Sequence, residues 1–327
     1  MKIATIGTGF IVDTFLNAVK LVPGAKCVAM YSRKYETGMP LAQKYGIPMI
    51  YTDLDKMLSN AEANFVYVAS PNSLHYEQAY QALGHGKNVI CEKPFTSTSK
   101  EAQHLIALAK KKHLMLFEAI ATIYLPNYSL IKANIARLGR IKIIQCNFSK
   151  YSSRYDRLKA GEITNAFDPD FSGGALVDLN VYNIHFIMNM FGPPRKITYH
   201  ANKHTNGIDT SGILIMEYAD FWAECVGSKD TNSMNFALIQ GENGYLLVED
   251  GANYCKKVIL CFPTERIVLN EQSKRNLLYY ELMEFNRIHA QQDFPKCYDI
   301  LAQSYGVMKI LEAARKSAGI VFPADKN

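Results

Sequence analysis

Apolar runs and helical patterns alternate regularly through the first part of the chain. Short strand-like runs, rich in β-branched residues, occupy residues 3–6, 27–31, 50–51, 65–69, 88–91 and 114–117. Helical patterns follow several of them, one ending near residue 22 and others covering 54–59, 74–84 and about 97–112. Strands that alternate with helices in this way predict an α/β fold, in which a parallel sheet is doubly wound with helices on both faces.

The pattern changes after Glu118. We expect helices at about 125–138, 175–190, 277–291 and 297–318, and strands at 141–148, 196–201, 211–218, 221–228, 234–240, 244–249 and 257–262. Short strands joined by turns that contain Asp, Asn and Gly favour a mostly antiparallel sheet. The sequence therefore predicts two domains, a doubly wound parallel one at 1–120 and an α+β one with an open sheet at 121–327.

Two glycines separate the first strand from the first helix. Gly7 and Gly9 form a Gly-x-Gly turn, and Phe10 and Ile11 begin the helix that follows. Such a turn lets the backbone approach a diphosphate, which the N-terminus of the helix then binds. Val12 stands where the third glycine of the dinucleotide fingerprint is usual. A plain tight turn is the alternative, but the order of strand, turn and helix favours a bound dinucleotide.

The residues after the second strand bear on which dinucleotide is bound. An acid at this place would accept hydrogen bonds from the ribose 2′-hydroxyl and favour NAD. This chain has Ser32, Arg33 and Lys34 instead, a hydroxyl and two cations that suit a 2′-phosphate, with Glu36 close by. We therefore expect an NADP(H) preference, with NAD as the alternative cofactor and a solvated loop as the alternative structure.

A third candidate for a functional site is a strand that ends abruptly in an acid, a base and a proline. The apolar run 88–91 is followed by Glu92, Lys93 and Pro94. Proline cannot donate a ladder hydrogen bond, so the strand ends there and Lys93 stands at its carboxyl end, where open α/β sheets bind ligands. Partial removal from water lowers the pKa of a lysine, and a lysine with a lowered pKa can transfer protons. An exposed loop lysine is the alternative.

Three polar residues fall on one face of the helix expected at 175–190. Asp178, Tyr182 and His185 are spaced at i, i+4 and i+7, while most of the neighbouring apolar residues lie on other faces. A solvated stripe is one interpretation, and one wall of a substrate site is the other. The aromatic and charged stretch 151–171, which we expect to be a long loop or short helices, could contact a sugar-like ligand.

Composition narrows the class of protein. Of 327 residues, 48% are hydrophobic and 20% charged, and 36 basic against 30 acidic residues give a net charge of +6. This excess is mild and scattered, which argues against a nucleic-acid partner, and no apolar run reaches the length of a membrane helix. Seven cysteines without metal-ligand spacing predict free thiols and no metal site. We expect a cytoplasmic protein without a membrane partner.

Several motifs resemble those of one known family. Besides Gly-x-Gly, the chain has Ala-Ser-Pro-Asn-x-x-His at 69–75, Gly-Lys-Asn-Val-Ile-Cys-Glu-Lys-Pro at 86–94 and Phe-Glu-Ala at 117–119. Together they resemble the glucose-fructose oxidoreductase/inositol dehydrogenase/MocA family, over essentially the whole chain. The resemblance implies cofactor contacts from the residues of these motifs, which are Gly7, Gly9, Phe10, Ile11, Ser32, Arg33, Ser70, Pro71, Asn72, His75, Glu92 and Lys93.

The helix at 175–190 also resembles an element of this family. Asp178 matches the family's acid and Tyr182 the His/Tyr position, and both would line the site near the nicotinamide. The resemblance adds His185 as a further substrate contact. Asn180 departs from the pattern, which commonly has glycine there. The family also implies a homodimer or higher oligomer formed through the outer face of the second sheet.

These residues lead to a hypothesis about the reaction. We expect an oxidoreductase that transfers a hydride between NADP(H) or NAD(H) and a sugar, polyol or related hydroxy or carbonyl compound. Lys93 and Tyr182 would form the acid–base pair. Either could carry the proton directly, and Tyr182 is favoured because a nearby ammonium stabilises phenolate. Asp178 would pair with Lys93 or hold substrate hydroxyls. Two alternatives remain, a cofactor-binding regulator without turnover and a redox-neutral enzyme that recycles its bound cofactor.

Overall fold

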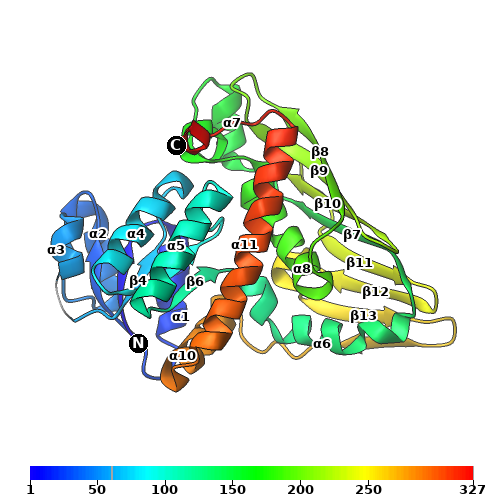
Figure 1. Ribbon diagram of the computed structural model, residues 1–327, viewed down its shortest axis with the longest axis horizontal. Coiled ribbons are helices and arrows are strands. Elements are labelled where there is room, and N and C mark those ends of the chain that lie inside the picture. The colour runs from blue at the N-terminus through cyan, green and yellow to red at the C-terminus, as the bar shows by residue number, and fades with distance from the viewer. Residues whose placement is uncertain (60–61, 327) are drawn as a thin grey trace. The chain divides into compact units, whose positions relative to one another are not determined.

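The computed structural model describes residues 1–59 and 62–326. The chain forms two compact units, each built from two segments. The first unit contains Met1–Ala119 and Lys274–Tyr305, and the second contains Ile120–Ser273 and Gly306–Asn327. Figure 1 traces the chain by colour from the N-terminus to the C-terminus.

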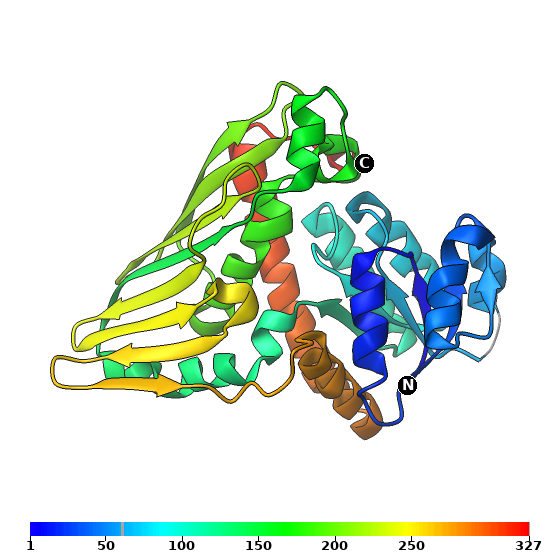
Figure 2. The same cartoon turned by 180° about the vertical axis from the view of Figure 1, so that it is seen from behind.

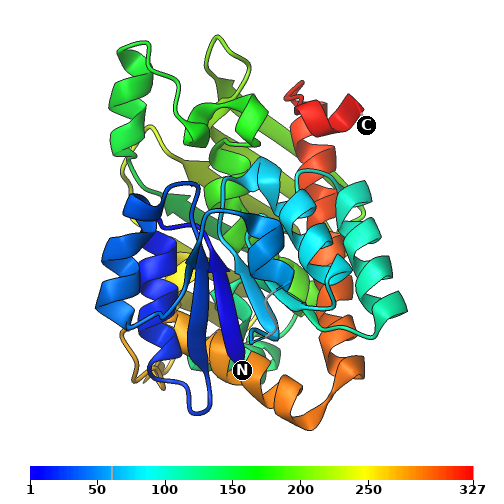
Figure 3. The same cartoon turned by 90° about the vertical axis from the view of Figure 1, so that its left-hand side faces the viewer.

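The first unit is built on a six-stranded sheet in the order β3-β2-β1-β4-β5-β6, with parallel strands throughout. Its strands are β1 (Lys2–Ile6), β2 (Lys26–Tyr31), β3 (Ile50–Tyr51), β4 (Phe65–Val68), β5 (Asn88–Glu92) and β6 (Leu116–Ala119). Its helices include α1 (Phe10–Val19), α2 (Tyr35–Tyr45), α3 (Leu54–Ser59), η1 (Asn72–Leu74), α4 (His75–Gly84) and α5 (Ser99–Lys112). Helices lie on both sides of this sheet (Figure 3). The doubly wound parallel fold expected from the sequence is confirmed.

One helix of the first unit was not expected. Helix α2 contains Pro40 and Gly38, two residues that disfavour a helix interior. Gly38 is buried, and a Cβ there would lie 3.2 Å from Cβ of Ser32. Helix α2 therefore approaches the end of β2 closely at this glycine, and the same glycine lowers the helix propensity of the segment.

A late segment completes the first unit. Helices α10 (Leu278–Gln291) and the first half of α11 (Phe294–Ser317) belong to it. The ring of Phe285 on α10 stacks on Phe117 of β6, with centroids 4.3 Å apart. The thiol of Cys297 on α11 donates to the carbonyl of Leu116, at 3.3 Å. The sequence assigned these residues to the second domain because periodicity shows which helix face is apolar but not which sheet covers it.

The second unit is built on an eight-stranded sheet in the order β14-β13-β12-β11-β7-β10-β9-β8. Strands β7 and β10 pair in parallel and the other neighbours are antiparallel, so the mostly antiparallel sheet is confirmed. The strands are β7 (Ile141–Ser149), β8 (Lys196–Lys203), β9 (Asp209–Glu217), β10 (Trp222–Ser228), β11 (Phe236–Gly241), β12 (Gly244–Glu249), β13 (Lys257–Cys261) and β14 (Arg266–Leu269). Strand β14 was not expected.

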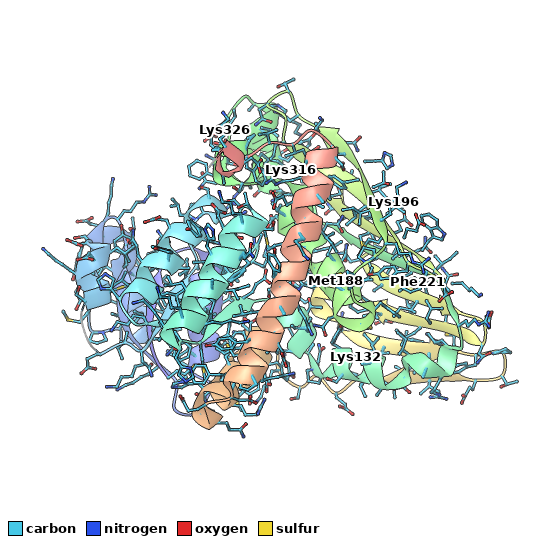
Figure 4. The ribbon with its side chains drawn as sticks, in the orientation of Figure 1. Lys132, Met188, Lys196, Phe221, Lys316 and Lys326 are labelled. Carbon is cyan, nitrogen blue, oxygen red and sulfur yellow. The ribbon has the colours of Figure 1, made fainter. Side chains whose placement is uncertain are left out.

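The helices of this unit lie on one side of the sheet, and several of them pack on it. They are η2 (Ala121–Tyr124), α6 (Pro126–Asn134), η3 (Ile135–Leu138), α7 (Ser153–Lys159), η4 (Asn165–Phe167), η5 (Pro169–Phe171), η6 (Leu176–Asn180), α8 (Val181–Phe191), α9 (Gly251–Tyr254), η7 (Pro323–Lys326) and the second half of α11. Met188 of α8, labelled in Figure 4, lies against α11, where a Cβ on Gly306 would come within 3.1 Å of its terminal methyl group. The tight packing of α8 between α11 and the sheet uses that glycine.

Among the described residues, no helix covers the other face of this sheet, which Figures 1 and 2 show from two sides. This open face carries Ile143, Ile213, Trp222, Tyr245 and Val268, each at least 40% exposed. A hollow of about 470 Å³ also lies over β7–β10, lined by polar residues such as Ser211 and Asp230. The subunit contact expected here stays a prediction. None of the described helices has the length and apolar character needed to cross a membrane.

Candidate active site

The loops at one edge of the first sheet contain the expected cofactor residues. Because all six strands run the same way, the turns after β1, β2, β4 and β5 meet at their shared carboxyl edge. Gly7 has φ +109°, and a Cβ on it would lie 2.6 Å from the carbonyl oxygen of Ala69. Gly9 is the N-cap of α1, and Phe10, the first residue of that helix, is 84% exposed. This glycine cradle at a helix N-terminus fits the diphosphate of a dinucleotide.

The turn after β2 is ordered by its serine and exposes its two cations. The Ser32 hydroxyl donates to the carbonyl of Lys34 at 2.8 Å and lies 2.5 Å from the hydroxyl of Thr37. Ser32 is buried, whereas Arg33 and Lys34 are exposed. Ser32 therefore shapes this turn, and the two cations are the residues that solvent and ligands reach.

His75 joins two of the cofactor loops. His75 is 1% exposed, with its Nδ1 2.9 Å from the carbonyl oxygen of Pro94 and its Nε2 3.0 Å from that of Ser70. Burial lowers the pKa of His75, and a neutral imidazole donates to one of these carbonyls at a time. His75 thus holds the loop after β4 against the cis Lys93–Pro94 turn after β5.

Glu92, the residue before Lys93, is a buried acid. Its carboxylate accepts a hydrogen bond from the hydroxyl of Tyr67 at 2.5 Å and one from the backbone N–H of Lys93 at 3.2 Å. Burial raises the pKa of Glu92 to about 7 in spite of these bonds. Glu281 on α10 is also fully buried, and burial together with Glu92 and Glu118 raises its pKa as well. The first unit therefore holds protons that the unfolded chain would release.

This arrangement predicts how stability depends on pH. The Glu92 carboxyl has a pKa of about 7 in the folded protein against an ordinary value of 4.5, so between these pH values the folded state binds more protons. Its contribution to the free energy of unfolding is therefore largest at acid pH and falls as pH rises through this window. We expect the wild type to lose about 2–3 kcal/mol more than Glu92→Gln between about pH 5 and about pH 8.

Urea denaturation at the two pH values measures this difference. Glu36→Gln, at an exposed position on α2, is the matched control and should change with pH as the wild type does. An identical pH dependence in the wild type and in Glu92→Gln would show that Glu92 is not the proton-binding group.

In the second unit, the site residues begin on a π-helical turn. Asp178 lies in η6 and Tyr182 in α8, directly after it. The Asn180 side chain donates to the carbonyl of Cys225 at 2.8 Å, and that of Asn183 donates to the carbonyl of Val226 at 3.0 Å. Asn180, which departs from the family pattern, therefore fixes η6 to β10. π-Helical turns occur frequently at functional sites.

Asp178 and Tyr182 are both partly exposed, whereas His185 is buried and 2% exposed. The ring of Tyr182 makes an edge contact with Phe148 of β7, with centroids 5.8 Å apart. The structure thus brings Asp178 and Tyr182 together on neighbouring turns and places His185 deeper in the unit. Lys93 belongs to the first unit, so its pairing with Tyr182 or Asp178 stays a prediction.

A lysine that the sequence did not single out completes this part of the site. Lys229, directly after β10, is 4% exposed and forms an ion pair with Asp178. Its ammonium also lies 5.2 Å from the ring centroid of Phe167 in η4. The only sequence signal was a lysine at a strand end, and Lys229 lies too far from Asp178 in sequence for periodicity to join them. Its neighbourhood includes part of the stretch 151–171, which forms the short helices α7, η4 and η5, one of the two structures that the sequence predicts there.

Among the described residues, no group of three or more His, Cys, Asp or Glu side chains is arranged to hold a metal ion. The polar groups of the site are instead carboxylates, a phenol and lysines. Such groups hold hydroxyls and move protons.

Comparison with known proteins identifies the family. Residues 1–120 match the model of the Gfo/Idh/MocA oxidoreductase family with an NAD-binding Rossmann fold, and residues 130–247 match the model of a Gfo/Idh/MocA C-terminal domain. The chain belongs to this family and is a nicotinamide-dinucleotide-dependent oxidoreductase.

Two curated relatives and one solved structure agree with this assignment. The NADP(+) scyllo-inositol 2-dehydrogenase IolU of Bacillus subtilis is 34% identical over 100% of this chain and 99% of its own length. The uncharacterized oxidoreductase YgjR of Escherichia coli is 34% identical over 99% of this chain and 98% of its own. KijD10, a 3-ketoreductase from Actinomadura kijaniata solved with NADP and TDP-benzene, has the same fold, with a TM-score of 0.87, 20% identity and 97% of each chain covered.

Proposed function

We propose that this oxidoreductase transfers a hydride between NADP(H) or NAD(H) and the carbinol carbon of a sugar, polyol or related hydroxy or carbonyl compound. The observation that carries the proposal is the pair of partly exposed polar side chains, Asp178 and Tyr182, on consecutive turns of the second unit. A substrate with several hydroxyls suits a carboxylate beside a phenol. The name of IolU, an inositol dehydrogenase, supports the same substrate class.

In the proposed reaction, the protein binds and orients both partners and moves one proton. The bound dinucleotide supplies the hydride acceptor for oxidation or the hydride donor for reduction. Lys93 and Tyr182 act as the acid–base pair, and during oxidation Tyr182 takes the hydroxyl proton while the C–H electron pair leaves as hydride. Asp178 accepts hydrogen bonds from substrate hydroxyls and fixes the position of the reacting carbon.

A substrate panel tests this function. The protein is incubated with NADP⁺ or NAD⁺ and a set of inositols, aldoses and alditols, and absorbance in the band of the reduced nicotinamide is followed. We expect reduction of the cofactor with at least one polyol. Cofactor binding without turnover on the whole panel would favour a regulator, and products without net redox change would favour an enzyme that recycles its cofactor.

We further propose that the cofactor is NADP(H), with Arg33 as a contact to its 2′-phosphate. The exposed Arg33 and Lys34 after β2 support this preference, as does the NADP(+) in the name of IolU. A charge-assisted hydrogen bond contributes about 1.5–3 kcal/mol, so Arg33→Ala should weaken NADPH binding about 10- to 100-fold and leave NADH binding unchanged.

Fluorescence titration gives the two dissociation constants. Lys56→Met, which removes a 77% exposed lysine on α3, is the control and should bind both cofactors as the wild type does. Equal affinity of the wild type for NADH and NADPH would refute the preference. An unchanged NADPH affinity in Arg33→Ala would remove Arg33 from the phosphate site.

A further inference from the structure

Lys229 connects four parts of the second unit. Its backbone N–H donates to the carbonyl of Thr210 in β9, at 2.8 Å, and its carbonyl accepts from the N–H of Ser152 before α7, at 2.9 Å. Its side chain runs past the ring of Phe167 in η4, and its ammonium donates to Oδ2 of Asp178 in η6. Backbone and side chain are thus held from different sides, which leaves the ammonium little freedom.

Burial makes this ion pair obligatory. The Lys229 side chain is 5% exposed, whereas that of Asp178 is 38% exposed. Removing an ammonium from water costs several kcal/mol unless a carboxylate and hydrogen bonds compensate. The carboxylate end of the pair stays accessible, and the ammonium end lies inside the unit. The geometry is that of a buried cation behind a carboxylate that a ligand can reach.

A second buried acid fixes the start of the same turn. Oδ2 of Asp209 accepts from the backbone N–H of Leu176 in η6 and from the hydroxyl of Tyr199, both at 2.7 Å. A Cβ on Gly174 would collide with this carboxyl, so the glycine permits its approach. Asp209 therefore fixes the backbone of η6, and Lys229 fixes the side chain that η6 presents.

We propose that Lys229 is a positioning residue that orients the Asp178 carboxylate toward substrate and ties it to the segment around Phe167. The inference rests on the proposed role of Asp178 as a substrate contact. Lys229 acts through Asp178, because its own ammonium is buried against that carboxylate and the Phe167 ring. A substrate that displaces the segment around Phe167 would also displace Asp178, because Lys229 joins the two. Binding of a substrate therefore depends on both the Phe167 segment and Asp178.

Loss of the cation should weaken catalysis through misplacement of Asp178. We expect Lys229→Met to lower kcat/KM for the polyol substrate about 10²-fold, because misplacement of about 1 Å costs that much. The dissociation constant of the cofactor, measured by fluorescence on the same preparation, should stay unchanged. Lys229→Arg, which keeps a cation able to bind a carboxylate, should recover most of the lost activity.

A double-mutant cycle with Asp178→Asn separates positioning from a general structural role. If Lys229 acts through Asp178, the double variant Lys229→Met/Asp178→Asn is no less active than Asp178→Asn alone. The inference would be overturned if the losses of kcat/KM in the two single variants multiply in the double variant. It would also be overturned by a wild-type kcat/KM in Lys229→Met beside an impaired Asp178→Asn. Either result would leave the proposed function intact. Full activity of Asp178→Asn would instead overturn the proposed role of Asp178, and the inference with it.

A further variant keeps the test decisive if Lys229→Met does not fold. Lys229→Gln keeps two N–H donors and removes the charge, on a side chain that is one atom shorter, so it can replace Lys229→Met throughout the cycle. The same non-additivity with Asp178→Asn is expected. Independent, multiplying losses in this cycle would refute the inference in the same way.

Discussion

Lys93→Met and Tyr182→Phe should each lower kcat by about 10²- to 10⁴-fold, the usual contribution of a positioned acid or base. Each substitution removes the proton-carrying or charge-stabilising group and keeps the bulk of the side chain. Cofactor binding should remain, because the glycine turn at Gly7 and the cations after β2 are untouched. Steady-state kinetics with the polyol found in the panel, together with a cofactor titration, measures both effects.

Matched substitutions away from the site are the controls for this prediction. Lys111→Met removes an exposed lysine in the last turn of α5, and Tyr80→Phe removes the hydroxyl of a tyrosine on α4 that is 46% exposed. Both should turn over as the wild type does. Near-normal kcat in Lys93→Met or Tyr182→Phe would remove that residue from the acid–base pair.

The largest expected effect on stability comes from a buried ion pair near the C-terminus. Arg315 on α11 is 1% exposed and binds Asp325 through two hydrogen bonds of 2.6 Å, while its guanidinium lies 4.2 Å from the ring centroid of Phe322. Burial acts to raise the pKa of Asp325, but its hydrogen bonds, chiefly those from Arg315, lower it overall. Removing one partner of a buried pair costs about 3–5 kcal/mol, and we expect Arg315→Met to lose that amount.

Urea denaturation of the whole chain measures the loss. The control lies one residue further along the same helix, at Lys316, labelled in Figure 4. Lys316 pairs with Glu312 and Asp325 but its side chain is 49% exposed, so Lys316→Met should cost no more than about 1 kcal/mol. Equal losses in the two variants would show that burial does not set the strength of these pairs.

The order of elements in the first unit could be predicted because its signals are local. A buried parallel strand is a short apolar run, and a helix has its own period and caps, so alternation of the two suffices for a doubly wound sheet. The same logic placed Gly7, Ser32, Ser70 and Lys93 at one sheet edge, because parallel strands end there together. Spacing along a single helix likewise placed Asp178 near Tyr182.

Contacts between distant segments could not be predicted in this way. The apolar pattern of a helix does not show which sheet the helix packs against. The assignment of α10 and part of α11 to the first unit therefore comes only from the structure, through contacts such as that of the Phe285 ring with Phe117. Helix α2 was missed because Pro40 and Gly38 disfavour a helix locally, and packing against the end of β2 overrides that preference.

The sequence by itself determined the parallel fold of the first unit and the mostly antiparallel sheet of the second, and it proposed the residue types of the candidate site, because periodicity, turns and strand ends are properties of neighbouring residues. Only the tertiary structure decided which groups are buried and paired. It joined Lys229 to Asp178, held His75 between two loop carbonyls and left the acids Glu92 and Glu281 buried. Desolvation and ion pairing depend on distance in space, which sequence separation does not encode.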